Sequence, residues 1–195
     1  MTTYQWTGRL ADPAFRKAKL KLDLHTHCYE ATNYTPPTPE IVQRIITRIK
    51  ARGLDGIAIT EHSDKSYGFK VMEMVERLFN NEVLILPGQE IDIQMRQEVE
   101  IYLPDDYAFR FLAHPGYPGG FNVVEGVQGI EIQNDLHDWH INKKRVTEVA
   151  QEKNLLLLSD SDAHDLNKIG TYFNEITLDE LFARSKKIVK TPSRN

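Results

Sequence analysis

Histidines and acidic residues occur in this sequence at spacings that suit the binding of metal ions. His25 and His27 are two residues apart, so in an extended strand both side chains point to the same face. Asp23 continues this alternation and is expected to orient His25 as a hydrogen-bond acceptor. Asp162 and His164 repeat the spacing of two near the end of the chain. Imidazole nitrogens with carboxylate oxygens suit Zn²⁺, Mn²⁺ or Fe²⁺, whereas Mg²⁺ and Ca²⁺ prefer oxygen ligands alone.

Further polar residues follow short apolar segments elsewhere in the chain. Glu61 and His62 follow LDGIAIT, Glu90 follows VLILPG, and His114 follows FRFLA. Taken singly, each has a structural interpretation as part of a surface pair, a helix cap or a turn before proline. Five of the seven histidines nevertheless lie at predicted strand ends beside carboxylates, and this conjunction favours a metal centre.

The residues between these motifs predict alternating strands and helices. The segment 20–25 alternates leucines with polar residues, as in a strand. Thr38-Pro39-Glu40 supplies a helix N-cap, a proline at the first helical position and an early acid, and Gly53 stands where the helix should end. Further strands are predicted at 54–60, 83–88, 99–103, 109–114, 129–134 and 155–160, and further helices at 70–79 and 141–153.

Apolar strands separated by helices predict an α/β fold with a mainly parallel sheet, either open or closed into a barrel. Polar residues at the C-terminal ends of several different strands favour the barrel, because an open sheet gathers them near one switch point. We expect one barrel domain over residues 20–195, preceded by an arm of uncertain structure over residues 1–19. The last residues, TPSRN, are expected to be a frayed tail.

Composition narrows the function classes. The 195 residues include 24 basic and 28 acidic ones, a formal net charge of −4, which gives no general attraction to nucleic acid or anionic membrane. The single cysteine, Cys28, excludes an internal disulfide and fits a reducing compartment. The N-terminus lacks a signal-peptide pattern, and apolar runs such as Leu155–Leu158 are far shorter than the ~20 residues that span a bilayer. We therefore expect a cytoplasmic protein.

The ordered motifs resemble those of the PHP (polymerase and histidinol phosphatase) superfamily. They are D-L-H-T-H (23–27), I-T-E-H (59–62), G-Q-E (88–90), H-P-G (114–116) and S-D-A-H (161–164), and the resemblance runs from about Leu20 to Gly170. It implies a distorted (β/α)7 TIM-like barrel with the metal site at the C-terminal rim of the strands. It also implies two or three divalent ions (Zn, Mn or Fe) and phosphoester hydrolysis.

The resemblance also implies roles for individual residues. Seven positions match the family's metal ligands: His25, His27, His62, Glu90, His114, Asp162 and His164. The family usually has an acid or histidine soon after H-x-H, where this chain offers Glu30, and another ligand on a later strand, where Glu100 is the best substitute. The arginine of the family's H-P-x-R form is missing. Asp162, His164 and a supporting Glu61 are the predicted catalytic residues.

The segment around HDWH offers candidate substrate contacts, and its histidines are also candidates for a replacement metal ligand. Asn134 ends a predicted strand, and His137 and His140 are three apart, so on a helix they share a face. A solvated helix start is the alternative interpretation.

These observations predict a phosphoesterase that hydrolyses a small phosphomonoester, such as histidinol phosphate, a sugar phosphate or a nucleotide, with a metal-activated water. A nuclease acting on oligonucleotide ends is an alternative that the acidic balance disfavours. An amidohydrolase usually needs a lysine near mid-barrel, and no lysine lies between residues 71 and 142. A non-catalytic, metal-stabilised module that docks on another enzyme is the remaining alternative.

Overall fold

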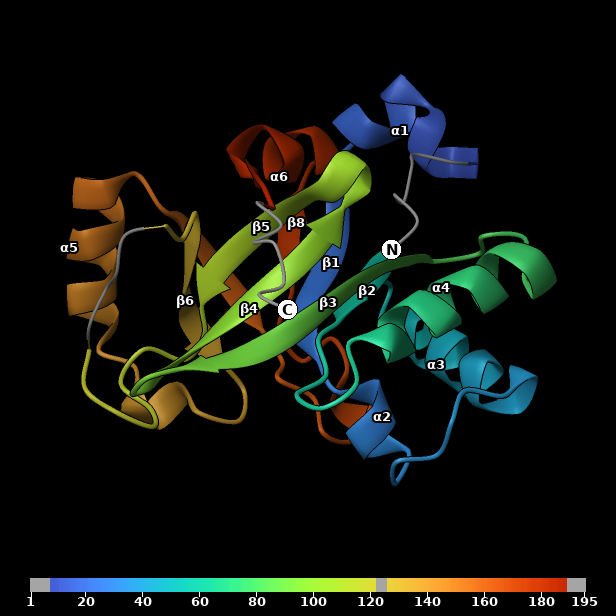
Figure 1. Ribbon diagram of the computed structural model, residues 1–195, viewed down its shortest axis with the longest axis horizontal. Helices are drawn as coiled ribbons and strands as arrows, with labels where there is room; N and C mark the ends of the chain where they lie inside the picture. The colour runs from blue at the N-terminus through green and yellow to red at the C-terminus, as the bar shows by residue number, and fades with distance from the viewer. Residues whose placement is uncertain (1–7, 122–125, 189–195) are drawn as a thin grey trace, which may run out of the picture.

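A computed structural model describes residues 8–121 and 126–188. In this part of the chain the strands form one strongly curved sheet, with the order β7-β6-β5-β4-β3-β2-β1-β8 and with β9 paired to β5 (Figure 1). The strand bounds are β1 Leu20–Thr26, β2 Gly56–Ile59, β3 Leu84–Ile93, β4 Arg96–Leu103, β5 Tyr107–Leu112, β6 Gly129–Asn134, β7 Leu156–Asp160, β8 Asn174–Ile176 and β9 Lys186–Lys187.

The sheet nearly closes into a barrel between its first and seventh strands. A parallel bridge pairs Thr26 at the end of β1 with Ala163 after β7. Deeper in, the amide of Leu24 donates a hydrogen bond of 2.7 Å to the Asp160 carboxylate. These contacts confirm the barrel-like α/β fold class predicted from the sequence.

The middle of the sheet differs from the mainly parallel prediction. Strands β1, β2 and β3 are parallel, and so are β5, β6 and β7, but β4 runs antiparallel to both β3 and β5. Only Gln94 and Met95 separate β3 from β4, a connection too short for the crossover of a dozen or more residues that parallel strands need. The chain therefore turns back as a hairpin, with Gln94 at a positive φ of 59°.

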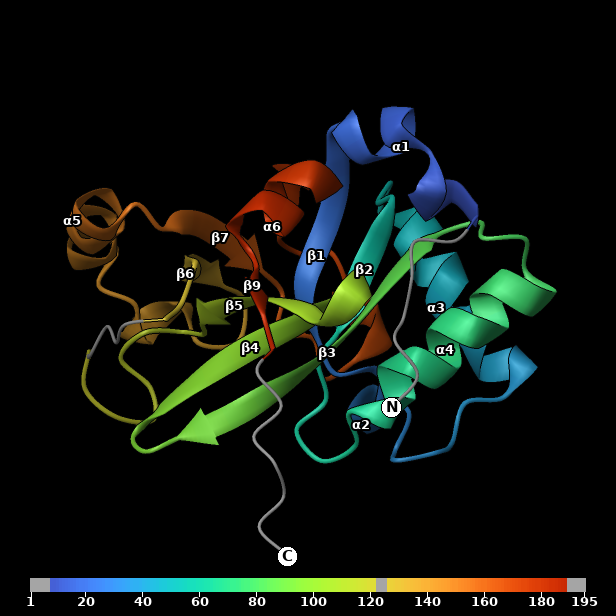
Figure 2. The same ribbon diagram turned by 45° about the horizontal axis from the view of Figure 1, so that its top comes forward.

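Helices cover the outside of the sheet. Helices α3 and α4 lie beside β2 and β3, and α5 lies on the other side beside β6 (Figures 1 and 2). The α-helices are α1 Pro13–Lys17, α2 Cys28–Ala31, α3 Pro39–Ala51, α4 Ser66–Leu78, α5 Lys143–Lys153 and α6 Leu178–Arg184. The 3₁₀ turns are η1 Gly8–Ala11, η2 Pro104–Asp106, η3 Asp138–His140 and η4 Leu166–Lys168.

Local chemistry sets the helix boundaries. The Thr38 hydroxyl accepts a hydrogen bond from the Ile41 amide and caps α3 as predicted. Helix α5 begins at Lys143 rather than 141, because the Asn142 side chain caps it by accepting a hydrogen bond from the Arg145 amide.

The predicted N-terminal arm contains η1 and α1 in its described part. Leu10 and Phe15 of this segment pack against buried residues of the barrel. Residues 1–7 and the predicted TPSRN tail lie outside the described residues.

A continuous apolar cluster occupies the barrel. Strands β1 to β5, β7 and β8 all contribute to it, with Leu22, Leu86, Ile101, Phe109 and Phe111 among its buried side chains. Because these strands pack their side chains against one another inside the barrel, their ends are kept in fixed relative positions. Within the described residues, no helix combines the length and apolar character needed to cross a bilayer.

Candidate metal centre

Acidic and imidazole side chains gather where the strands end at one rim of the barrel. His25 is the last residue but one of β1, and His27 follows that strand directly. Glu90 lies within β3, His114 follows β5, and Asp162 follows β7. These five residues come from four different strands, which is the arrangement that a barrel-type active site uses.

Four buried residues form the centre of this group: His25, His27, Glu90 and Asp162. Their candidate ligand atoms all lie within 4.8 Å of one another. Nε2 of His27 is 3.2 Å from Oδ1 of Asp162 and 3.4 Å from Oε2 of Glu90. Nε2 of His25 is 3.3 Å from the same Glu90 oxygen.

Two further groups share members with this first one. His27 also belongs to a group with Glu30, His62 and His164, in which Nε2 of His164 is 3.6 Å from Oε2 of Glu30. The structure thus brings Glu30 into the site as the sequence predicted.

The third group joins His114 and His137 to Asp162. Nε2 of His114 lies 3.9 Å from Oδ2 of Asp162, and Nε2 of His137 lies 4.0 Å from the same oxygen. His137 was expected to be a substrate contact or a replacement ligand, and the structure places it among the potential ligands. The three groups are contiguous because His27 and Asp162 are each shared.

Unpaired polar atoms provide a test of whether this centre fits a metal ion. Nε2 of His25, Nε2 of His27 and Oδ1 of Asp162 are buried, and none has a hydrogen-bond partner among the described residues. Leaving a buried polar atom unpaired costs about 1–3 kcal/mol, and more for a charged one. A divalent cation would satisfy these atoms together, and the mixed nitrogen and oxygen donors suit Zn²⁺, Mn²⁺ or Fe²⁺. The residues present therefore fit such an ion.

The side chains of the centre shift one another's pKa. Burial by itself lowers the pKa of His25, but the nearby carboxylates, Asp162 foremost, outweigh burial and raise it well above its ordinary value. Burial also lowers the pKa of His27, but Asp162 and Glu90 outweigh burial and raise it to about 9. Burial favours a higher pKa for Asp162, yet the imidazoles hold it below its ordinary value. The carboxylates therefore stay ionised, which is the state that a metal ligand needs.

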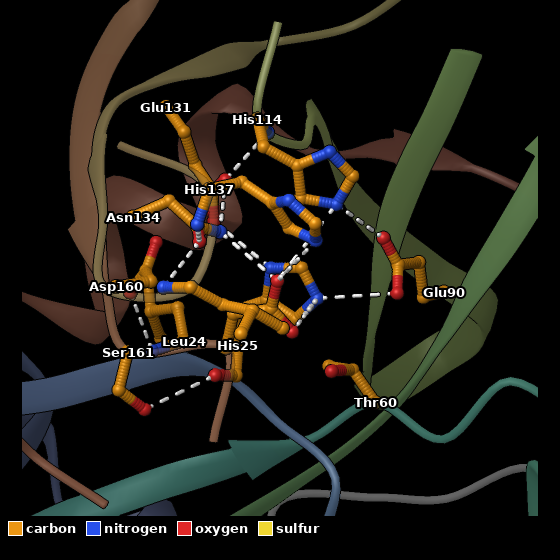
Figure 3. A network of polar contacts seen from close by, with 12 residues as sticks. Leu24, His25, Thr60, Glu90, His114, Glu131, Asn134, His137, Asp160 and Ser161 are labelled. Carbon is orange, nitrogen blue, oxygen red and sulfur yellow. Dashed lines mark hydrogen bonds and ion pairs between the residues drawn. The ribbon is translucent and has the colours of Figure 1, made fainter. Parts of the chain in front are cut away.

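Glu131 of β6 holds several of these side chains in place, as Figure 3 shows. One of its oxygens accepts a hydrogen bond from Nδ1 of His25 at 2.9 Å, which leaves Nε2 of that ring facing the centre. Its other oxygen accepts from the backbone amide of His114 at 2.6 Å and from the Asn134 side chain at 2.9 Å. Glu131 was not among the residues predicted from the sequence, although an acid between two isoleucines of a buried strand is a usable signal.

Asp23 does not orient the His25 ring as predicted. Its carboxylate instead accepts hydrogen bonds from the hydroxyl and amide of Ser161 at 2.6 and 3.1 Å, and from the amide of Gly170 at 2.8 Å. It contacts only the backbone amide of His25, at 3.4 Å. Asp23 thus ties β1 to the segment that carries Asp162, while Glu131 takes the orienting role.

Asn134 links Glu131 to the third group of potential ligands. Its amide donates to Oδ2 of Asp162 at 3.2 Å, and its carbonyl oxygen accepts from the backbone amides of Leu136 and His137. The residue predicted to contact substrate is therefore placed to position Asp162 and His137. His140 belongs to none of the three groups, and its ring lies 4.8 Å from that of Tyr117, centroid to centroid.

Two other predicted residues lie outside the three groups. Oε1 of Glu61 accepts a hydrogen bond from the Tyr29 amide at 2.7 Å, and burial raises the pKa of Glu61 to about 7. Glu100, the suggested substitute for a later ligand, forms an ion pair with Arg110 and lies near the Tyr102 hydroxyl. The structure does not bring Glu100 into the centre, because its neighbours Val99 and Ile101 point into the barrel core and Glu100 lies on the opposite face of β4.

Comparisons with known proteins identify the fold. No protein-family model matches the chain, and no curated protein matches it. PsfC from Pseudomonas syringae superposes with a TM-score of 0.60 at 16% identity, covering 87% of this chain and 90% of PsfC. A protein from Bifidobacterium adolescentis, named as a candidate metal-dependent phosphoesterase, gives 0.62 at 13% identity, with 87% and 97% covered. An amidohydrolase from Chromobacterium violaceum with bound sulfate gives 0.57 at 14% identity, with 85% and 97% covered.

Proposed function

We propose that the protein is a metal-dependent hydrolase of small phosphomonoesters, as the PHP-like motifs of its sequence imply. The observation that carries this proposal is the set of three contiguous groups of imidazoles and carboxylates at one barrel rim, joined by His27 and Asp162. The phosphoesterase named among the structural neighbours supports the same reaction class. The group of donors suits two or three ions of Zn, Mn or Fe.

Different residues of the chain would bind the ions, orient the ligands and exchange protons. His25, His27, Glu90 and Asp162 would bind the central ions, and Glu131 and Asn134 would hold those ligands in orientation. When bound, divalent ions supply Lewis-acid polarisation of the ester and activation of water. His62 and His164, each about one-third exposed at the rim, are the groups placed to exchange protons with a leaving group or with solvent.

The pocket over the centre favours a small substrate. It measures about 210 Å³ and is lined by His62, Glu90, Gln97, His114, Tyr117, Leu136, His137, Asp162 and His164. No lysine or arginine is among these residues, so the pocket offers no basic side chains to the successive phosphates of a nucleic-acid strand. We therefore propose a small phosphorylated compound as the partner, and the buried free thiol of Cys28 suits a cytoplasmic location.

The first experiment measures phosphate release from a panel of phosphomonoesters and short oligonucleotides by the Mn²⁺-reconstituted protein. Asp162→Asn removes a ligand charge shared by two groups and should reduce turnover at least a hundredfold. Asp165→Asn is the matched control, since Asp165 is exposed and an asparagine caps η4 equally well. Full activity in Asp162→Asn would overturn the proposal.

A further inference from the structure

One wall of the pocket is apolar, although the centre below it is polar. Tyr117 and Leu136 line the pocket beside His114 and His137, and they remain 38% and 48% exposed. Burying large apolar side chains is favourable, so two of them together at the mouth of a polar site indicate a surface that a ligand covers.

Ring contacts extend this wall outward from the centre. The His137 ring stacks on Tyr117, with centroids 4.3 Å apart and an angle of 19° between the planes. Tyr117 lies 4.8 Å from His140, and His140 contacts Trp139, which is exposed. We call Tyr117, Leu136, His137 and His140 the aromatic wall.

The wall is held in position by a close approach of backbone. Gly116 has a φ of +112°, and a Cβ built on it would lie 2.7 Å from the carbonyl oxygen of His140. Only glycine fits there without displacing the loop after β5 from η3. The rings of Tyr117 and His140 are therefore brought together by the fold and present a fixed surface to a ligand.

Size and charge specify what the wall would contact. Small-molecule pockets usually measure about 300–1,000 Å³, so a pocket of about 210 Å³ holds the phosphate end and leaves the rest of the ester at the mouth. The absence of lysine and arginine from the lining disfavours a second anionic group on the ligand. A flat, uncharged group is the chemistry that complements tyrosine, leucine and imidazole surfaces.

We infer that the aromatic wall is a subsite for the leaving group, and that the substrate is a phosphomonoester whose leaving group carries a neutral aromatic ring. This inference rests on the proposed function for the position of the phosphate. Within the class of small phosphomonoesters, it favours esters of aromatic alcohols over sugar phosphates.

The test compares two non-hydrolysable ligands, benzylphosphonate and ethylphosphonate, by calorimetry on the Mn²⁺-reconstituted protein. Benzylphosphonate should bind about tenfold more tightly. Leu136→Ser should remove most of this preference, measured as the ratio of the two affinities. Leu157→Ser is the matched control, because Leu157 is 39% exposed on β7 and does not line the pocket. Equal binding of the two phosphonates, or a preference that survives both Leu136→Ser and Tyr117→Ser, would overturn the inference.

Turnover of benzyl phosphate and ethyl phosphate separates this inference from the proposed function. Both esters release alkoxides of similar basicity, so a difference in kcat/KM reports binding of the ring rather than leaving-group reactivity. Hydrolysis of both at equal kcat/KM would leave the proposed function standing and overturn the subsite. A preference for benzylphosphonate without hydrolysis of either ester would support the subsite and overturn the proposed function.

Discussion

Each nitrogen of the His25 ring has a different partner, and this division defines the centre at the scale of single residues. Nδ1 donates to Glu131, and Nε2 is left facing Glu90 and Asp162. A histidine ligand generally needs such a fixed tautomer, because only the deprotonated nitrogen has a lone pair to offer. Glu131 therefore governs the chemistry of the centre without facing it.

Glu131→Gln should weaken Mn²⁺ binding about 10- to 100-fold. A glutamine in this place meets three donors with only one acceptor oxygen, so it cannot hold His25 and the His114 amide at the same time. Chelator competition measures the affinity. Glu175→Gln on β8 is the control, since Glu175 is exposed. Unchanged affinity in Glu131→Gln would show that His25 is oriented by packing alone.

Metal affinity should rise with pH between about pH 6 and pH 9. Burial lowers the pKa of His27, but the adjacent carboxylates of Asp162 and Glu90 raise it to about 9, so the metal-free ring is protonated at neutral pH. Binding must displace this proton, which costs about tenfold in affinity for each pH unit below the pKa. Titration calorimetry in buffers of different ionisation enthalpy should detect proton release at pH 7, and the contribution of His27 to this release should fall as the pH approaches 9.

The same shift predicts the opposite trend for the stability of the metal-free protein. The pKa of His27 is higher in the folded state than its ordinary value of 6.5, so the stabilisation is fully present below about pH 6.5. It is lost as the pH rises through about 9. An increase in the free energy of unfolding over this range would contradict the assigned direction.

At the scale of elements, strand ends and the turns after them deliver the ligands. The loop after β5 carries His114 and Tyr117, and it packs against η3, which follows His137. Their contact depends on Gly116, where the backbone of His140 occupies the space of a side chain. The third group of ligands and the aromatic wall therefore both require glycine at position 116.

Gly116→Ala should lower the free energy of unfolding by about 1–3 kcal/mol, because alanine is strained at this φ and meets the His140 carbonyl. Urea unfolding measures the loss. Gly120→Ala is the matched control, since its added Cβ would meet nothing within 4 Å and its φ is not positive. Equal stability of the two variants would show that the loop and η3 separate at little cost.

At the scale of the whole molecule, the barrel brings together residues that are up to 139 positions apart in sequence, since 164 minus 25 is 139. The apolar cluster inside the sheet holds their strands in fixed relation. Buried carboxylates and imidazoles at the rim work against this stability unless cations compensate them. Folding and metal binding are therefore expected to be linked.

Removal of metal by a chelator should lower the Tm of the whole domain. An ion present at a hundredfold its Kd stabilises the folded state by about 2.7 kcal/mol, and this contribution disappears with the ion. Differential scanning calorimetry with and without Mn²⁺ measures it. Asp162→Asn should show a much smaller difference, and an equal difference in that variant would place the stabilising ion elsewhere.

The sequence by itself predicted the fold class and most of the elements, because strand alternation, helix periodicity and caps are local properties. The Thr38 cap, the β1 alternation and the apolar β7 are examples, and the barrel-like α/β fold is confirmed. It also named His25, His27, His62, Glu90, His114, Asp162, His164 and Glu30, which the structure gathers at one rim. Their type and position at strand ends identified them without any knowledge of distance.

Only the tertiary structure decided which of the remaining polar residues belong to the centre. Glu100 is a suitable ligand by residue type but pairs with Arg110 across β4 and β5, while His137 joins His114 and Asp162. The side chain that orients His25 is Glu131 rather than the neighbouring Asp23, and the aromatic wall combines Tyr117 with Leu136. These pairings depend on strand direction and on contacts between distant segments. Local sequence patterns contain neither, because a side chain's partner is set by the packing of the whole barrel.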